Sequence, residues 1–222
     1  MSVELSFCVV NTERRALLRY CLDAIARERA TLDFAVEVLV LDHASADGSA
    51  AAARDHPATT EVIALSERRP DAANETLLLQ RARGRVCLLL LEDSELEPGA
   101  TAALHAALAD DPGAGAATAQ LVGPDGDALP SAWSFPRPWG RLPGLEPYAV
   151  QSRGEGVRRV DWARSTALLV RREAAAAVGW LDASLPPPTD ALDFCRRLRR
   201  AGWHTLYVPT ARAVHHELPA PA

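Results

Sequence analysis

The sequence predicts a single α/β domain with a mostly parallel central sheet and helices on its faces. Short apolar runs with the composition of strands alternate with segments of helical period, which is the pattern of β-α-β units. Polar or acidic residues directly follow several of these strands, as expected where parallel strands end and ligands bind. The 222 residues are enough for one such domain with a sizeable core and are few for two.

The clearest strand is the run V-C-L-L-L-L at 86–91, which is followed by the acidic residues Glu92, Asp93 and Glu95. Six apolar residues are too few to cross a membrane and are typical of a central strand buried on both faces. Because burying an unpaired carboxylate is costly, the acidic residues must lie where the strand leaves the sheet. They indicate either a ligand site at that edge or a polar turn that leads into the next helix.

The first half of the chain contains three further strands and three helices. The strands are expected at residues 5–10, 36–41 and 61–65, and the helices at 14–29, 49–54 and 72–83. Right-handed crossovers between parallel strands bring the loops after these strands to one edge of the sheet. We therefore expect Asn11, Asp42 and Glu92 to face the same crevice.

The second half of the chain is less regular. Helices are expected at 101–109, 172–178 and 190–201, and strands at 114–122, 166–170 and 205–208. Residues 130–156 are rich in proline and glycine and also contain aromatic side chains, which predicts a long irregular loop. This loop either forms a mobile flap over a pocket or is held against the core by its aromatic residues.

Composition and charge exclude several classes of protein. The chain is 48% hydrophobic and 24% charged with a net charge of -5, as in ordinary soluble domains, and its one dense basic run, 196–200, fits the outer face of a helix, so no nucleic-acid partner is expected. Neither a signal peptide nor an integral membrane segment is visible, which predicts a cytoplasmic protein. Cys8, Cys21, Cys87 and Cys195 lack metal-ligand spacing and are expected to be buried free thiols rather than disulfides.

Several short motifs follow one another from Val9 to about His216. They are V-V-N-T-E, V-L-D-H-A-S-A-D-G-S, A-R-G-R-V-C-L-L-L-L-E-D-S-E-L-E-P-G-A, G-P-D-G-D-A-L-P-S-A, V-D-W, A-L-L-V-R-R-E-A-A-A-A-V-G-W-L-D, D-F-C-R-R-L-R-R-A-G-W and V-P-T-A-R-A-V-H. In this order and spacing, the chain resembles the inverting family 2 glycosyltransferases with the GT-A fold, especially their rhamnosyltransferase-like branch. The resemblance implies a single glycosyltransferase-like domain over 1–222, with a nucleotide-sugar-binding half at 1–100 and an acceptor-side half at 101–222.

The resemblance implies that Asn11, Thr12, Glu13, Asp42 and His43 bind the base and ribose of a nucleotide-diphosphate-sugar linked to UDP, GDP or dTDP. A carboxylate at a strand end can accept hydrogen bonds from a ring N–H or from ribose hydroxyls. In the alternative, such a carboxylate only caps the next turn.

The resemblance also implies a metal site and a catalytic base. Asp93 matches the family's metal-binding aspartate, and His215 matches a histidine near the metal, so that Mg²⁺ or Mn²⁺ would be held against the donor diphosphate; the alternative for His215 is a surface residue. Glu92 and Glu95 are expected to point elsewhere. Asp190 or Asp193 would deprotonate the hydroxyl of a glycan or lipid-linked acceptor and cause inversion. Polysaccharide or glycan assembly is the implied process, and peripheral contact with the inner face of the membrane is left open.

Four positions depart from the family pattern. Leu91 and Ala191 stand where acidic residues or asparagine are expected, and Leu78 and Ser165 stand where glycine is expected. These departures support an alternative hypothesis, a catalytically inactive relative that acts as a binding or scaffold subunit. A dehydrogenase-like nucleotide-binding domain is disfavoured because no G-x-G-x-x-G follows the first strand.

Overall fold

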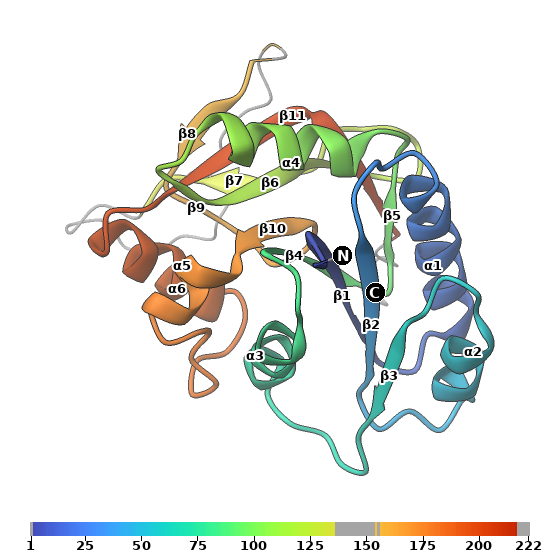
Figure 1. The fold of residues 1–222 in the computed structure, drawn as a ribbon. Coiled ribbons are helices and arrows are strands. Elements are labelled where there is room, and N and C mark those ends of the chain that lie inside the picture. Colours follow the sequence, from blue (N-terminus) through green and yellow to red (C-terminus); the bar gives the residue numbers. More distant parts are fainter. Residues whose placement is uncertain (1, 136–153, 155, 217–222) are drawn as a thin grey trace.

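A computed structural model describes residues 2–135, 154 and 156–216, and it consists of a central sheet with helices on both faces (Figure 1). The helices are α1 (Arg15–Arg29), α2 (Ser49–Asp55), α3 (Asp71–Arg81), α4 (Ala100–Asp110), α5 (Arg172–Ala177) and α6 (Thr189–Arg200). The strands are β1 (Leu5–Asn11), β2 (Val36–Asp42), β3 (Glu61–Ala64), β4 (Val86–Leu91), β5 (Ser94–Leu96), β6 (Ala114–Val122), β7 (Ala132–Trp133), β8 (Arg158–Val160), β9 (Trp162–Ala163), β10 (Leu168–Arg171) and β11 (His204–His215). Most of the flap expected at 130–156 lies outside the described residues.

The described strands form one large sheet in the order β3-β2-β1-β4-β10-β6-β11-β5, with β8 added beside β11 and a separate β7-β9 pair. Strands β3, β2, β1 and β4 are mutually parallel, and so are β6 and β11. Strand β10 runs antiparallel to both of its neighbours, β4 and β6. The mostly parallel α/β sheet is confirmed, and one reversed strand connects its two parallel parts.

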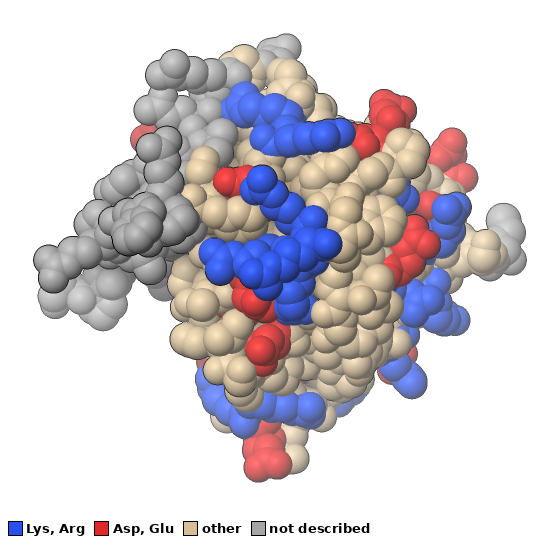
Figure 2. All heavy atoms as spheres, turned by 90° about the vertical axis from the view of Figure 1, so that its left-hand side faces the viewer, with Lys and Arg blue, Asp and Glu red and all other residues tan. Residues whose placement is uncertain are grey.

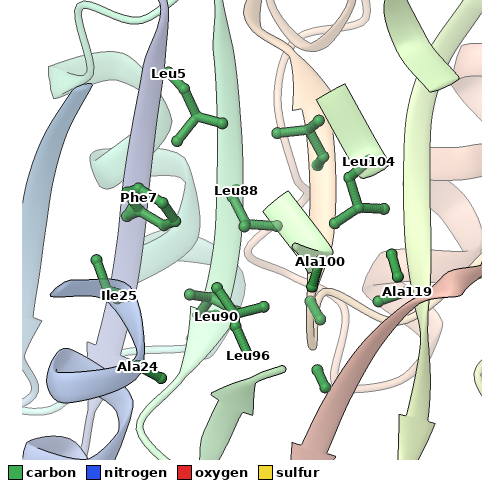
Figure 3. Packing of buried hydrophobic residues seen from close by; sticks show 14 of the residues in the cluster. Leu5, Phe7, Ala24, Ile25, Leu88, Leu90, Leu96, Ala100, Leu104 and Ala119 are labelled. Atoms are coloured by element: carbon green, nitrogen blue, oxygen red, sulfur yellow. The ribbon is translucent and has the colours of Figure 1, made fainter. Parts of the chain in front are cut away.

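The two faces of the sheet are covered because the central strands are apolar on both sides. In β1, Leu5, Phe7 and Val9 pack on one face while Cys8 and Val10 pack on the other. The first face is covered by α1, α2 and α4, and the second by α3, α5 and α6 (Figure 1). Figure 3 shows side chains of α1 and α4 meeting those of β1 and β4 on the first face. A strand buried in this way can present polar groups only at its ends.

The acidic segment after β4 differs from the expected turn. It contains the short strand β5, which pairs antiparallel with the end of β11 so that Ser94 lies opposite His215. Strand β11 is also longer than the expected 205–208. This pairing joins segments more than a hundred residues apart, so no local pattern indicates it. Its consequence is that the last described strand returns to the acidic segment.

Two of the four arginines in the basic run of α6 form ion pairs with neighbouring carboxylates. Arg197 pairs with Asp193 at 2.6 Å, and Arg199 pairs with Asp161 at 2.7 Å. Figure 2 shows basic side chains gathered with acidic ones on the face of the molecule that carries α6. Every helix in the described part of the chain is too short or too polar to pass through a bilayer. The four cysteines are buried free thiols, as expected.

Glycine is required where α3 leads into β4. A Cβ on Gly84 would lie 2.6 Å from both the backbone nitrogen and Oγ of Ser6. The Gly84 N–H donates to Ser6 Oγ, which in turn donates to the buried carboxylate of Glu37. Glu37 also accepts hydrogen bonds from the backbone and guanidinium of Arg83. This network fixes the end of α3 against β1 and β2.

A second buried carboxylate, Glu28 of α1, caps helix α4. Its two oxygens accept hydrogen bonds from the backbone N–H groups of Gly99 and Thr101, each at 2.7 Å. Helix α4 has no capping side chain of its own. Glu28 therefore satisfies N–H groups that a helix leaves without intrahelical partners, and its charge is favourable beside the helix N-terminus.

Glu28→Ala is expected to lower the free energy of unfolding by about 1–3 kcal/mol, because the buried N–H of Thr101 and the part-buried N–H of Gly99 lose their acceptor. Urea denaturation at neutral pH measures this change. Arg19→Ala, on the exposed side of the same helix, is the control and should change stability by less than about 0.5 kcal/mol. Equal losses in the two variants would contradict the capping role.

Candidate active site

A cavity of about 470 Å³ lies at the carboxyl ends of β1 and β4. It is bounded by the loops that follow these strands, the start of α3, the segment before β10, the start of α6 and the end of β11. Its polar and charged lining residues are Thr12, Arg14, Asp71, Glu75, Glu92, Asp93, Arg164, Ser165, Thr166, Asp190 and His215. The volume is in the range of small-molecule sites, and both halves of the chain contribute to it.

Asp93 is held between the first loop and the last described strand. Its Oδ2 accepts a hydrogen bond from Nη1 of Arg14 at 2.8 Å, and its Oδ1 lies 3.4 Å from Nε2 of His215. Burial acts to raise the pKa of Asp93, but His215 and Arg14 outweigh it and keep this pKa below its usual value. The carboxylate is therefore ionised at neutral pH although it is buried.

The remaining two acidic residues of this segment differ from each other. Glu92 was expected to point away, but it is buried and lines the cavity, where burial and the nearby Asp93 raise its pKa to about 7. Glu95 does lie outside the cavity, where it accepts from Arg27 at 2.9 Å and lies 3.1 Å from the ring of His216. The prediction for Glu92 was wrong because its N–H donates to the carbonyl of Val10, which continues the pairing of β4 with β1 and keeps the residue at the cavity.

Asp93 and His215 form a donor set that fits a divalent cation. Oδ1 of Asp93 is buried and accepts no hydrogen bond from the described residues. Two ligands of one Mg²⁺ at about 2.0–2.1 Å lie roughly 3 Å apart, so a separation of 3.4 Å is compatible with a shared ion. No cluster of three or more His, Cys, Asp or Glu side chains suited to a metal occurs in the described part of the chain. A bound ion would therefore need further ligands from substrate or water.

The loops after β1 and β2 are joined by side-chain hydrogen bonds. Asn11 Nδ2 donates to Oδ1 of Asp42 at 3.0 Å, and Oδ2 of Asp42 accepts from the backbone of Ser45. His43 lies with Nδ1 3.3 Å from Oγ1 of Thr12, and its Nε2 accepts from the backbone of Arg69. Because Nε2 accepts, a neutral His43 has its proton on Nδ1 and donates to Thr12.

The five residues expected to bind the nucleoside thus lie together, but only Thr12 of these five lines the cavity. Glu13 has a positive φ of 56° and accepts from the backbone of Ala46 and from Arg68. Each carboxylate oxygen of Asp42 accepts one hydrogen bond from the protein, whereas Oδ1 of Asn11 is buried without a hydrogen-bond partner among the described residues. This oxygen is an available acceptor beside the cavity.

The two candidate bases have different surroundings. Asp190, at the start of α6, lines the cavity, and its Oδ1 accepts from the backbone of Ala191. Burial raises its pKa, and Asp71 adds to the effect. Asp193 lies one turn later, pairs with Arg197 and does not line the cavity. The geometry favours Asp190 over Asp193 as a group that could reach a ligand.

The sequence prediction missed Glu75 of α3. Glu75 is buried and lines the cavity, and its Oε1 accepts a hydrogen bond from Ser165 Oγ at 2.6 Å. Burial is the largest cause that raises its pKa to about 8, with additional repulsion from Asp190 and Asp71. A signal was present in the sequence, because Glu75 lies three positions after Ala72 and three before Leu78, on the apolar face of the helix.

Three of the four departures from the family pattern lie at the cavity. Leu91, Ser165 and Ala191 line it, and Ser165 is the partner of Glu75. Leu78 is instead buried in the core between α3 and the sheet. The apolar side chains of Leu91 and Ala191 reduce the number of carboxylates around the site.

The open α/β sheet with this cavity at its strand ends is the architecture of a domain that binds a small molecule at the carboxyl ends of its strands. The chain belongs to the glycosyltransferase-like family 2, whose model matches residues 4–221. The N-acetylglucosaminyl-diphospho-decaprenol L-rhamnosyltransferases of Mycobacterium tuberculosis strains CDC 1551 / Oshkosh and H37Rv are each 33% identical over 137 residues. This match covers 56% of the chain and only 45% of each relative. It supports the rhamnosyltransferase-like branch.

Solved structures share the fold at low sequence identity. GalNAc-T7 with UDP, GalNAc and Mn²⁺ superposes with a TM-score of 0.73 at 17% identity, over 97% of this chain and 44% of that one. The mannosyltransferase PcManGT from Pyrobaculum calidifontis, in complex with GDP-Man and Mn²⁺, gives 0.70 at 18% identity, over 99% of this chain and 58% of that one. S. aureus TarS 1-349 in complex with UDP-GlcNAc gives 0.70 at 14% identity, over 99% and 62% of the two chains. The GT-A fold expected from the motifs is confirmed.

Glu75 makes stability depend on pH. Between its ordinary pKa of 4.5 and the raised value of about 8, the folded protein keeps a proton that the unfolded chain releases. The free energy of unfolding therefore falls as pH rises through this window, by at most about 1.4 kcal/mol per pH unit for one proton. Glu75→Gln removes this contribution, so the wild type should lose stability relative to the variant from about pH 5 to about pH 8.

Urea denaturation of both proteins at several pH values measures this difference. Comparing the two proteins cancels the contributions of other groups that titrate in the same range. Glu173→Gln, an exposed substitution on α5, should leave the pH dependence of the wild type unchanged. A constant difference between wild type and Glu75→Gln across the window would show that Glu75 titrates normally.

Proposed function

We propose that this domain transfers a sugar from a nucleotide-diphosphate-sugar to an acceptor hydroxyl with inversion at the anomeric carbon. The observation that supports this best is one cavity of about 470 Å³ shared by Asp93, His215 and Asp190. A cation-binding pair and a further carboxylate in the same cavity suit a donor diphosphate and an acceptor hydroxyl, respectively. Family membership and the GT-A fold agree with this activity.

In the proposed step, the acceptor oxygen forms a bond to the anomeric carbon as the bond from that carbon to the diphosphate breaks. The electron pair of the broken bond leaves with the nucleoside diphosphate, and the acceptor proton passes to Oδ2 of Asp190. The raised pKa of Asp190 makes this carboxylate a better proton acceptor than an ordinary aspartate. Attack from the side opposite the leaving group gives inversion.

Asp93 and His215 are the residues that would hold a divalent cation. When bound, the cation would supply positive charge to the leaving diphosphate. A carboxylate and an imidazole together suit Mn²⁺ better than Mg²⁺, since Mg²⁺ prefers oxygen ligands and imidazole binds transition metals well. We therefore propose Mn²⁺ as the preferred ion, which is also the ion in the complexes of two structural neighbours.

The proposed donor is linked to UDP, GDP or dTDP, with its nucleoside on the side of Asn11, Thr12, Glu13, Asp42 and His43. Oδ1 of Asn11 is an unused acceptor there for a base N–H or a ribose hydroxyl. In this proposal residues 1–100 bind the donor, with His215 added at the cation, and the rest of residues 101–222 supplies the acceptor side. The named activity of the mycobacterial relatives suggests a lipid-linked glycan acceptor, which the protein would meet at a membrane surface.

A second candidate function is a binding or scaffold subunit without transferase activity. Two observations favour it, namely the apolar side chains of Leu91 and Ala191 in the cavity, at positions where the family pattern predicts polar groups. Such a subunit would still bind the nucleotide sugar with metal. The two candidates therefore differ in turnover rather than in donor binding.

Donor binding is expected to depend on metal and nucleotide together. Thermal unfolding with UDP, GDP and dTDP, each with and without Mn²⁺, should show one nucleotide that raises Tm together with Mn²⁺ by more than the sum of their separate effects. Asp93→Asn should abolish this cooperativity because it weakens the oxygen ligand. Glu95→Gln, outside the cavity, is the matched control and should retain it. Absence of any nucleotide effect on the wild type would reject the proposed donor site.

Asp190→Asn is expected to lower turnover by roughly 10²-fold or more while leaving donor binding intact, as for a group that acts in the transition state. Release of nucleoside diphosphate in the presence of acceptor measures turnover, and Tm shifts measure binding. Asp193→Asn is the control in the same helix and should retain most activity. Donor binding by the wild type without turnover on any acceptor would instead support the binding subunit.

A further inference from the structure

Arg14 is a cation at the cavity for which neither the sequence motifs nor the family match provides a role. It precedes α1, and its guanidinium donates to Oδ2 of Asp93 at 2.8 Å while Nε lies 3.6 Å from Oε1 of Glu92. Its side chain is 41% exposed, whereas that of Asp93 is 4% exposed. Arg14 therefore has one edge fixed by Asp93 and further N–H groups on the accessible side.

The two oxygens of Asp93 serve two different cationic sites. Oδ2 is bound to Arg14, while Oδ1 faces His215 and is the oxygen suited to a divalent cation. A cation held by Oδ1 would thus share Asp93 with the guanidinium bound to Oδ2. A diphosphate has oxygens on both phosphorus atoms, so one molecule can contact both cationic groups.

The negative charge of the cavity wall also favours a positive side chain such as Arg14 at the diphosphate. Glu92 and Asp93 lie side by side there, and a nucleoside diphosphate is itself an anion. With Leu91 in place of a further polar ligand, the protein supplies Asp93 as the one carboxylate of the expected metal motif. A planar guanidinium that donates two parallel hydrogen bonds is well suited to phosphate oxygens.

We infer that Arg14 binds the diphosphate of the nucleotide donor, with Asp93 as the residue that positions it. The inference rests on the proposed function and extends it to a residue of the first loop. Arg14 keeps its hydrogen bond to Asp93 and donates from its remaining N–H groups to a phosphate oxygen. As the bond between sugar and diphosphate breaks, negative charge grows on the diphosphate and the interaction with Arg14 strengthens.

The test compares Arg14→Gln, Arg14→Lys and the control Arg19→Gln, which removes the same charge from an exposed position of α1. Calorimetric titration in Mn²⁺ uses two probes, the nucleoside diphosphate among UDP, GDP and dTDP that stabilises the wild type, and inorganic pyrophosphate. Arg14→Gln should weaken both by about tenfold or more. Arg14→Lys should retain part of the affinity as a point charge, and Arg19→Gln should match the wild type.

Binding of Mn²⁺ alone, measured by electron paramagnetic resonance, distinguishes this role from a structural one. Removing a positive charge beside Asp93 should leave Mn²⁺ affinity unchanged or increase it, while diphosphate affinity falls. Parallel loss of Mn²⁺ and diphosphate binding, or unchanged diphosphate affinity, would overturn the inference. If no nucleoside diphosphate binds the wild type but pyrophosphate binds in an Arg14-dependent way, the inference holds and the proposed nucleotide donor is rejected.

Discussion

The site depends on one buried carboxylate, Asp93, which must be ionised and therefore must be surrounded by positive charge. Two distant segments contact it: Arg14 in the first loop is a permanent cation, and His215 at the end of β11 is positive only when protonated. Burial of the carboxylate without them would raise its pKa and cost several kcal/mol. The pairing of β5 with β11 places His215 beside Asp93, and the position of the first loop beside β4 places Arg14 there. Both arrangements are thus needed to keep the Asp93 carboxylate ionised. The ionised state of Asp93 therefore depends on residues from both ends of the chain.

Sequence reasoning identified the parts of the fold that are encoded locally. The apolar runs at β1, β2 and β4 and the polar residues after them predicted both the parallel strands and the edge at which ligands bind. The pairing of β5 with β11 escaped prediction because it depends on contacts between segments over a hundred residues apart. Glu92 was misplaced because it continues the pairing of β4 with β1 and so stays at the cavity instead of turning away.

Glu75 was missed for a different reason, because a lone glutamate in a helix is normally solvated. The residue lies on the apolar face of α3, and its environment is set by Ser165 and Asp190, which come from the other half of the chain. Ser165 had been noted only as the loss of a glycine. The structure shows that this hydroxyl is the hydrogen-bond partner of Glu75, so the departure from the family pattern has a local physical consequence.

The cavity gathers Glu75, Glu92, Asp93 and Asp190 in one small volume, and such a group of carboxyls is unfavourable without bound ligands. The folded protein reduces the charge by keeping Glu75 protonated and by raising the pKa of Glu92 and Asp190. Asp93 remains charged because cationic partners contact it. Burial and repulsion from neighbouring carboxylates dominate for Glu75 and Asp190, and Glu92 has Nε of Arg14 only at 3.6 Å. The same cluster therefore separates into carboxyls with a raised pKa and one ionised carboxylate that can hold a cation. This division is what an inverting transfer from a diphosphate requires, and it arises from burial and charge placement rather than from any single motif.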